Sequence, residues 1–407
     1  MKNIFETSAS NGGPLSGLKV LDLTRVLSGP FGTMWLATMG ANVIKIENPT
    51  DPDVTRNYVP GINGKSAYFP TVNHNKRGIT LNLKAEEGKE IFRELVKQAD
   101  VVIENFRPGV MDKLGLGYEA LSKINPGIIY ASISGYGTYG PYSQRPGYDV
   151  TAQAMSGIMY ITGMPDNPPT RVGSSIGDTI GGMNAVVAIL AAVYHKMQTG
   201  EGQMVETSLV DGLIALSAQD YIRYFAAGQV PERMGNIYKT WTPYGNYKAK
   251  DGYYNVGSST PKFFPLFCKT IGHPELVEDP RFKVVATRVQ SPNREELDEY
   301  INEWAKDKTV KEVIDLLVAA GVPCAPVNSI VEMSQDEHIS GARDMFPTIN
   351  QKGIGEFRVT NIPVRFHKSG LAPLSSSPDL GEHNDDILMC LGKTKEEIEK
   401  LREDGVI

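Results

Sequence analysis

The stretch Leu18–Glu47, LKVLDLTRVLSGPFGTMWLATMGANVIKIE, decides the fold. Its first part, Leu18–Leu23, is a short apolar run of the kind that forms a buried strand. A helix is predicted over Pro30–Met39, because proline suits the first turn of a helix and Gly40 suits the position after its end. A second apolar run, Val43–Glu47, is predicted to be a strand. The order strand, helix, strand predicts two parallel strands joined by a crossover helix.

The same alternation continues to about residue 135. An amphipathic helix is predicted over Glu86–Gln98, and strands are predicted at Val101–Ile103 and Ile128–Ser134. A long helix, Thr179–Gln198, carries apolar residues at helical spacing and ends before Gly200. Strands and helices in alternation predict an α/β fold built on a doubly wound parallel sheet.

The pattern changes beyond about Arg233. A hairpin is predicted around Asp251-Gly252, and helices are predicted near Phe263–Ile271 and Arg294–Ala305, which together indicate a smaller α+β unit. We therefore divide the chain into a flexible leader (1–14), a large domain (15–225), a small domain (226–326) and a C-terminal segment that returns to the large domain (327–407).

Composition and charge narrow the class of protein. The 407 residues carry a net charge of −6 and no polybasic block, so neither nucleic acid nor a membrane is an expected partner. The longest uncharged helical stretch, Thr179–Tyr194, is shorter than the ~20 apolar residues of a membrane span and is interpreted as a core helix. Three widely spaced cysteines and no visible secretory signal predict reduced thiols in a cytoplasmic protein.

Two patterns argue against common cofactors. Gly135–Gly140 matches the spacing G-x-G-x-x-G after a strand, but Pro141 and Pro146 follow where a dinucleotide-binding fold needs the start of a helix. We interpret this segment as a loop. The six histidines have no neighbours at metal-ligand spacing, so no metal site is predicted.

Asp178 lies where the small-residue loop Gly173–Gly177 runs into the long apolar helix. Aspartate is a favoured N-cap, and on position alone capping is the leading interpretation. The alternative is chemical, because a carboxylate among short residues at the positive end of a helix can meet a substrate closely. The neighbouring glycines also fit tight turning and close helix packing. Local spacing leaves both interpretations open.

Two further polar segments also have two interpretations each. Asn73–Arg77 is basic and precedes a strand, so it is suited to binding phosphate, although a solvated loop is the favoured interpretation. Glu104–Gly109 follows the third strand, at the edge where α/β folds bind ligands. Its structural interpretation is a plain turn between a strand and a helix.

Taken in order, these segments resemble the class III coenzyme A transferases, the family of formyl-CoA and crotonobetainyl-CoA:carnitine transferases. The resemblance covers nearly the whole chain. It is carried by Leu21–Pro30, Gly40–Glu47, Asn75–Arg77, Glu104–Phe106, Arg145–Asp149, Gly177-Asp178 and Gly381–His383.

The resemblance implies a Rossmann-like large domain, a smaller α+β domain and a homodimer of interlocked subunits. It implies that Asp178 is catalytic and that CoA or acyl-CoA is a substrate, with no permanently bound cofactor. The implied CoA contacts lie in one early turn and at five later positions: Arg25, Val26, Leu27, Ser28, Leu81, Lys84, Asn105, Phe106 and Lys113.

The chain departs from the family pattern at two places. Asn48 stands where formyl-CoA transferase has an arginine on the adenine side, and the glycine-rich flap becomes Asn236–Thr240, so the resemblance does not carry the flap motion over. Within the family, the chain is most similar to transferases that use succinyl-CoA and a dicarboxylate or similar acceptor.

The implied chemistry suits an aspartate. At its ordinary pKa of about 4, the side chain is ionised at neutral pH. The carboxylate attacks the acyl-CoA thioester to give a mixed anhydride, and CoA thiolate then attacks the aspartyl carbonyl to give an enzyme thioester. The acceptor acid finally attacks that thioester and receives CoA. Backbone N–H groups among the glycines would stabilise the oxyanions.

Two other functions stay open. A racemase of related fold pairs its aspartate with a histidine for proton transfer, but Tyr148 occupies that position and is not a near-neutral base. A non-catalytic CoA-binding protein would have no need of Asp178.

Overall fold

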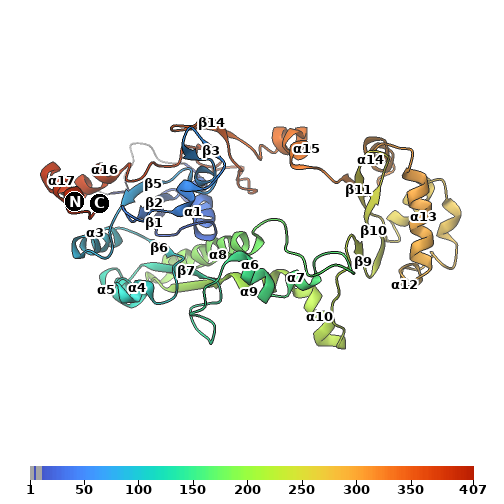
Figure 1. The fold of residues 1–407 in the computed structure, drawn as a ribbon, viewed down its shortest axis with the longest axis horizontal. Helices are drawn as coiled ribbons and strands as arrows, with labels where there is room; N and C mark the ends of the chain where they lie inside the picture. Colours follow the sequence, from blue (N-terminus) through green and yellow to red (C-terminus); the bar gives the residue numbers. More distant parts are fainter. Residues whose placement is uncertain (1–3, 6–11) are drawn as a thin grey trace. The chain divides into compact units, whose positions relative to one another are not determined.

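The computed structural model describes residues 4–5 and 12–407, which form two compact units (Figure 1). The larger unit contains the described chain up to Ile158, together with Arg171–Ala227 and Ser340–Ile407. The smaller unit contains Met159–Thr170 and Gly228–Ile339. Most of the predicted leader, residues 1–14, lies outside the described residues.

A six-stranded parallel sheet forms the centre of the larger unit. Its strands are β1 (Lys19–Asp22), β2 (Asn42–Glu47), β5 (Arg77–Thr80), β6 (Val101–Glu104), β7 (Ile129–Ser134) and β8 (Met204–Ser208). They lie in the order β5-β2-β1-β6-β7-β8. Val20 of β1 pairs with Val43 of β2 on one side and with Val101 of β6 on the other. The predicted parallel sheet is confirmed, and β8 is an edge strand that the sequence did not indicate.

Helices and short strands complete the larger unit. They are α1 (Ser28–Thr38), α2 (Phe69–Asn73), α3 (Glu86–Val96), α4 (Val110–Lys113), α5 (Tyr118–Ile124), α6 (Asp149–Met155), α7 (Ile158–Ile161), α8 (Ile176–Thr199), α9 (Leu209–Leu216), α10 (Ala218–Ala227), α16 (Asn384–Cys390), α17 (Lys395–Glu403), the 3-10 helix η1 (Val54–Asn57) and the hairpins β3 (Gly61–Ile62) with β4 (Lys65–Ser66) and β13 (Thr348–Gln351) with β14 (Gly355–Arg358). The helix α7 continues three residues beyond the boundary of this unit.

Each face of the sheet carries its own hydrophobic core. Successive residues of β1 point to opposite faces, so Leu21 packs with Phe92 of α3 and Val20 packs with Met34 of α1 and Ile189 of α8. Both cores consist of fully buried side chains. The alternation of strand residues therefore produces the doubly wound arrangement.

Glycines bring the first turns of α1 and α8 together. A Cβ on Gly182 would lie 2.4 Å from the carbonyl oxygen of Ser28, and one on Gly32 would lie 2.8 Å from the carbonyl oxygen of Gly182. Only glycine permits backbone contact this close. The close-packing explanation of the glycines near Asp178 is confirmed for Gly182, and it places the start of α1 beside the first turns of α8.

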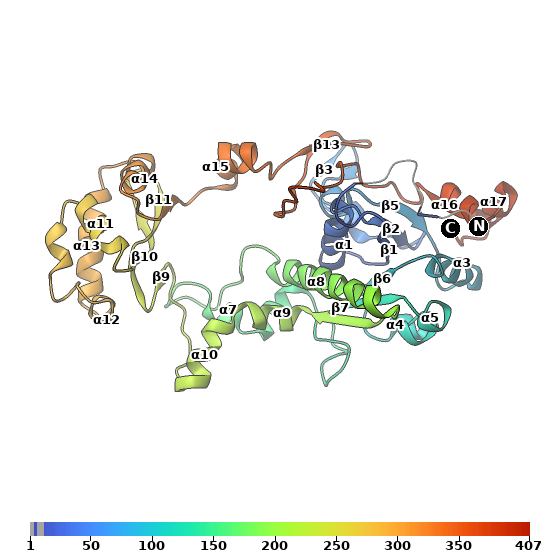
Figure 2. The ribbon, with the colours of Figure 1, turned by 180° about the vertical axis from the view of Figure 1, so that it is seen from behind.

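The helix α8 is longer than the sequence suggested. It has 24 residues, so by length and composition alone it is long enough to cross a membrane, and the length argument from Thr179–Tyr194 is wrong. In this structure α8 packs against α1, α9 and β7 (Figure 2). A core helix of a globular protein passes the same length test, so the test carries no further conclusion.

The smaller unit has an antiparallel sheet of its own. Its elements are β9 (Ile237–Tyr238), β10 (Trp241–Lys248), β11 (Tyr253–Gly257), β12 (Cys324–Pro326), α11 (Phe263–Thr270), η2 (Pro274–Val277), α12 (Val285–Arg288), α13 (Asn293–Ala305), α14 (Val310–Ala319), α15 (Ile330–Gln335) and the π-helical turn Glu337–Ala342, which ends in the larger unit. The predicted hairpin is the pair β10–β11, and both predicted helices are present as α11 and α13.

The C-terminal segment closes the β5 edge of the large sheet. The backbone N–H of Gly78 donates to Nδ1 of His383 at 3.1 Å, and the N–H of Thr80 donates to Oδ1 of Asn384 at 2.9 Å. The helix α17 begins after Thr394, whose reciprocal hydrogen bonds with Glu397 form a capping box.

Candidate active site

A pocket of about 450 Å³ gathers most of the implied site residues at the carboxyl edge of the sheet. The turn after β1 supplies one wall, and the loop after β6 supplies another. The predicted residues that line this pocket are Arg25, Val26, Leu27, Ser28, Asn105, Phe106 and Asp178. Residues far apart in sequence therefore meet where the carboxyl ends of β1, β6 and β7 lie together.

A second pocket of about 280 Å³ holds the other implied contacts. Leu81 and Lys84 line it, and Arg25 and Phe106 line both pockets, which makes the two pockets neighbours. Asn48 also lines this second pocket. Lys113, at the end of α4, is exposed and lines neither pocket.

Asp178 is the third residue of α8 and not its cap. Ser175 is the N-cap residue, so the capping interpretation of Asp178 is wrong. Among residues 4–5 and 12–407, we find no hydrogen bond or ion pair to the Asp178 carboxylate. Burial, and then the negative charge of Asp149, raise the pKa of Asp178 to about 7. The expectation of an ordinary pKa near 4 is therefore wrong, because burial and a like charge both disfavour the ionised carboxylate.

Asp149 connects the helix α6 to the first turn of α8, which carries Asp178. Its carboxylate accepts a hydrogen bond from the N–H of Gly177 at 2.8 Å and another from Nε2 of Gln153 at 2.8 Å. The Gln153 side chain in turn accepts from the N–H of Val172 at 3.0 Å. Sequence reasoning assigned Asp149 no role, since nothing local indicates that it faces a glycine 28 residues later.

The basic segment Asn73–Arg77 is not a solvated loop, because its residues are buried or half-buried, and Asn75, Lys76 and Arg77 line a small pocket of about 240 Å³. Lys76 is buried, and its Nζ donates to Oδ2 of Asp22 at 3.0 Å, to the carbonyl of Pro30 at 3.1 Å and to Oδ1 of Asn73 at 2.8 Å. Burial raises the pKa of Asp22, but Lys76, Lys45 and two threonine hydroxyls outweigh it and lower that pKa to about 2. Within the segment, Lys76 thus forms an internal ion pair with Asp22 behind the start of α1.

The turn after β6 lies in the pocket wall, as its ligand-edge interpretation predicts. Its Asn105 side chain, however, is engaged inside the protein. Oδ1 of Asn105 accepts from the N–H of Arg25 at 2.8 Å, and Nδ2 donates to the carbonyl of Arg25 at 2.8 Å. Asn105 therefore holds the neighbouring wall, while Phe106 faces both pockets.

The loop interpretation of Gly135–Gly140 is confirmed. The strand β7 ends at Ser134, and the next helix, α6, begins only at Asp149. Gly135 and Gly147 approach so closely that a Cβ on either would lie 2.7 Å from the other's Cα. Of the three spaced glycines, Gly135 makes this close contact, and the spacing does not open a helix.

Comparison with known proteins identifies the class of protein to which this fold and this pocket belong. The model of CoA-transferase family III matches residues 15–384, and the chain belongs to this family of CoA-transferase enzymes. The chain is 43% identical to acetyl-CoA:oxalate CoA-transferase of Acetobacter aceti, over 80% of this chain and 84% of that protein. It is 37% identical to succinyl-CoA:glutarate CoA-transferase of Mus musculus, over 97% and 90% of the two chains.

A solved structure shows the same fold. The crystal structure of a CAIB/BAIF family protein from Brucella suis matches with a TM-score of 0.82 at 38% identity, and the match covers 93% of this chain and 99% of that chain. The suspected family resemblance is therefore confirmed.

Proposed function

We propose that this enzyme transfers CoA from an acyl-CoA donor, with succinyl-CoA favoured, to a dicarboxylic acid through covalent intermediates on Asp178. One observation carries the proposal. The carboxylate of Asp178 is mostly buried, has no partner among the described residues and lines the same pocket as six of the implied CoA contacts. A carboxylate in that setting is poorly solvated and therefore available for attack.

The proposed reaction proceeds by four exchanges at carbonyl carbons. The Asp178 carboxylate attacks the donor thioester, the C–S bond breaks, and CoA thiolate leaves behind a mixed anhydride. The thiolate attacks Cγ of Asp178 and releases the donor acid, which leaves an aspartyl-CoA thioester. The acceptor carboxylate attacks that thioester and releases thiolate again, and the thiolate then attacks the acceptor acyl carbon and frees Asp178. The thioester energy is conserved because every bond broken is replaced by an equally activated one.

The two neighbouring pockets support a path for CoA. We place the nucleotide end of CoA in the pocket lined by Leu81 and Lys84 and the thioester beside Asp178. Arg25 and Phe106, which line both pockets, would flank the connecting arm. The pocket lined by Leu81 and Lys84 is the outer pocket, and the one beside Asp178 is the inner pocket. The outer pocket has Asn48 where formyl-CoA transferase has an arginine. Of the cations that line it, Lys84 is the one without an ion-pair partner among the described residues.

The charge of the inner pocket supports a substrate with a second carboxylate. Arg107 and Arg145 both line it, and neither has a carboxylate partner within residues 4–5 and 12–407. Arg145 lies over the ring of Tyr142 at 3.7 Å, which holds its guanidinium in place. Arg25, in contrast, is paired with Asp51 at 2.9 Å. The two curated relatives named above act on dicarboxylates, oxalate and glutarate, which agrees with this choice.

The racemase alternative has less support. Tyr148 lines the inner pocket, and none of the residues that line it is a histidine. A two-base proton transfer would therefore lack the second base that such a reaction needs at neutral pH.

Trapping with hydroxylamine tests the covalent route. Hydroxylamine added with succinyl-CoA should convert Asp178 to a hydroxamate, which peptide mass spectrometry detects. Because the attacking form is the carboxylate and its pKa is about 7, the trapping rate at low succinyl-CoA should rise with pH through 7 and level off above it. Asp149→Asn removes the neighbouring negative charge and should move this midpoint to lower pH. Turnover without any hydroxamate would contradict the covalent route.

We further propose that the enzyme is a homodimer of interlocked subunits. The helix α10 has no buried residue, and Ile222, Tyr224 and Phe225 are exposed large side chains that a second subunit would cover. Light scattering should give twice the 44.5 kDa mass of one chain, and a monomer at micromolar concentration would contradict the proposal. The cytoplasmic location expected from the cysteines stays a prediction.

A further inference from the structure

Val26, in the turn between β1 and α1, has an unfavourable backbone conformation. Its φ is +70°, in the left-handed region that β-branched residues avoid. The other non-glycine residues with positive φ in the described chain are two asparagines and an aspartate, which tolerate this region well. Strain of this kind persists only where the surrounding structure holds it, and it is concentrated at functional sites.

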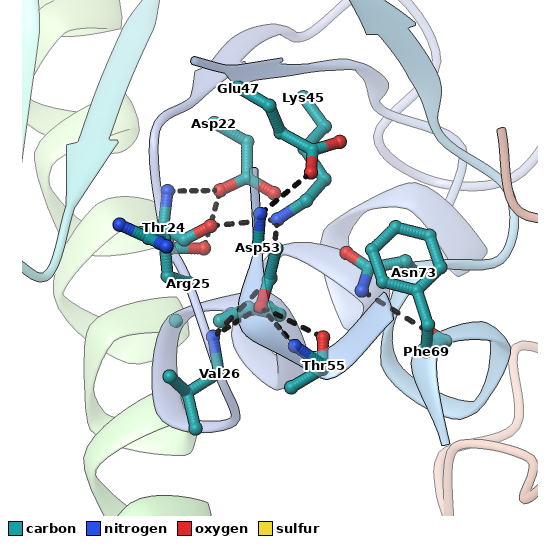
Figure 3. A network of polar contacts seen from close by, with 12 residues as sticks. Asp22, Thr24, Arg25, Val26, Lys45, Glu47, Asp53, Thr55, Phe69 and Asn73 are labelled. Carbon is teal, nitrogen blue, oxygen red and sulfur yellow. Dashed lines mark hydrogen bonds and ion pairs between the residues drawn. The ribbon is translucent and has the colours of Figure 1, made fainter. Parts of the chain in front are cut away.

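Three side chains from outside the turn hold it, and Figure 3 shows two of them, Lys45 and Asp53. Nζ of Lys45 donates to the carbonyl of Thr24 at 2.7 Å. Asn105 bonds both the N–H and the carbonyl of Arg25 at 2.8 Å. The N–H of Val26 donates to the two carboxylate oxygens of Asp53 at 3.2 and 3.3 Å. The backbone of three successive residues is thus fastened from outside the turn.

Of these three side chains, Asp53 is the one that bonds the strained residue Val26 itself. Its carboxylate is fully buried, pairs with Nζ of Lys45 at 3.0 Å and also accepts from the N–H and the hydroxyl of Thr55 at 3.1 and 2.8 Å. Burial raises the pKa of Asp53, but Lys45 and the Thr55 donors outweigh it and leave that pKa below its ordinary value. The carboxylate is therefore charged, and its hydrogen-bonding capacity is used within the protein.

The turn held in this way forms part of the active-site wall. Val26, Leu27 and Ser28 line the pocket together with Asp178, and Ser28 begins α1. The residue after Asp53, Val54, lines the same pocket. A change in the φ of Val26 would rotate the following backbone and move this wall relative to Asp178.

We propose that Asp53 is a positioning residue for CoA transfer, which holds Val26 in its left-handed conformation and so sets the wall that faces Asp178. The proposal rests on the assignment of this pocket as the active site. Asp53 also lines the outer pocket, but its side chain is fully buried and its carboxylate is bonded within the protein, so it acts through the Val26 backbone. Lys45 keeps the Asp53 carboxylate charged and fixed in place.

The test is a double-mutant cycle between positions 53 and 26. Asp53→Asn should lower kcat/KM for transfer between succinyl-CoA and glutarate by about 10- to 100-fold, the range expected when strain of this size is no longer held. The same loss is expected in a Val26→Ala background, because alanine also disfavours positive φ. In a Val26→Gly background the loss should shrink to less than about threefold, because glycine adopts this conformation without cost.

Controls separate positioning from simple destabilisation. Asp315→Asn removes an exposed carboxylate on α14 and should leave kcat/KM unchanged. If Asp53→Asn fails to fold because Lys45 loses its partner, the neutral pair Lys45→Gln with Asp53→Asn replaces it in all three backgrounds. Circular dichroism and thermal melts establish the folded fraction of every variant.

The proposal would be overturned by equal losses in the glycine and alanine backgrounds, or by an unchanged kcat/KM in folded Asp53→Asn. It would also be overturned if both position-53 variants failed to fold, because Asp53 and Lys45 would then serve stability alone. The cycle measures CoA transfer by whatever route it takes. A failure of the covalent mechanism would appear separately, in the hydroxylamine experiment.

Discussion

Asp178→Ala should reduce CoA transfer to background, a loss of at least ~10⁴-fold, which is the scale seen when the nucleophile of a covalent mechanism is removed. The reason is that, in the proposed mechanism, the anhydride and the thioester both form on this carboxylate. Binding of CoA should change little, because the implied contacts in both pockets remain. Initial rates with succinyl-CoA and glutarate, together with calorimetric titration of CoA, measure the two quantities.

Asp178→Asn and a surface variant sharpen this test. The pKa of Asp178 is about 7 in the folded protein and near 3.8 when unfolded, so above pH 7 the folded state carries a buried charge that opposes folding. Asp178→Asn removes that charge and should raise the melting temperature at pH 8 while activity is lost. Asp315→Ala, on the exposed face of α14, should alter neither property. Residual transfer above about 1% in Asp178→Ala would exclude this residue as the obligatory nucleophile.

Lys76→Met should destabilise the larger unit by about 3–5 kcal/mol, the usual cost of removing one partner of a buried ion pair. The Lys76 and Asp22 side chains are fully buried, and the variant leaves the Asp22 carboxylate with two hydroxyl donors, the backbone N–H of Thr24 and the more distant charge of Lys45. Urea unfolding followed by circular dichroism measures the change.

A matched pair of variants tests the cause of that loss. Lys311→Met removes a lysine that is 84% exposed from its pair with Asp315 and should cost less than about 1 kcal/mol. Asp22→Asn in the Lys76→Met protein removes the stranded charge and should recover part of the stability. A cost below about 1 kcal/mol for Lys76→Met would show that other groups stabilise the buried Asp22 carboxylate when Lys76 is absent.

Much of the sheet was predictable because its signals are local. Leu18–Leu23, Pro30–Met39 and Val43–Glu47 match β1, α1 and β2 within two residues, since short apolar runs, a proline in the first turn and a terminal glycine act on their own neighbours. Segments without such signals were missed. The strand β8 is only partly buried and the helix α10 has no buried residue, so neither carries the pattern of a core element.

The candidate site divides in the same way. The order of motifs along the chain was enough to point to the family, to Asp178 and to the turn Arg25–Ser28. It could not indicate that Asn105 binds the backbone of Arg25, 80 residues earlier, or that Lys76 is buried against Asp22. Such contacts depend on which strands become neighbours, and here β6 and β2 lie on either side of β1.

The sequence by itself determined the strand–helix–strand unit and the family, and it pointed to Asp178 as the proposed nucleophile. Only the tertiary structure decided the state of that carboxylate. Its pKa of about 7 arises from burial and from Asp149, which is 29 positions away in the chain. The strain at Val26 likewise depends on Asp53, whose carboxylate reaches the turn from the loop after β2. Solvation and charge act through distances in space, and those distances exist only once the sheet has assembled.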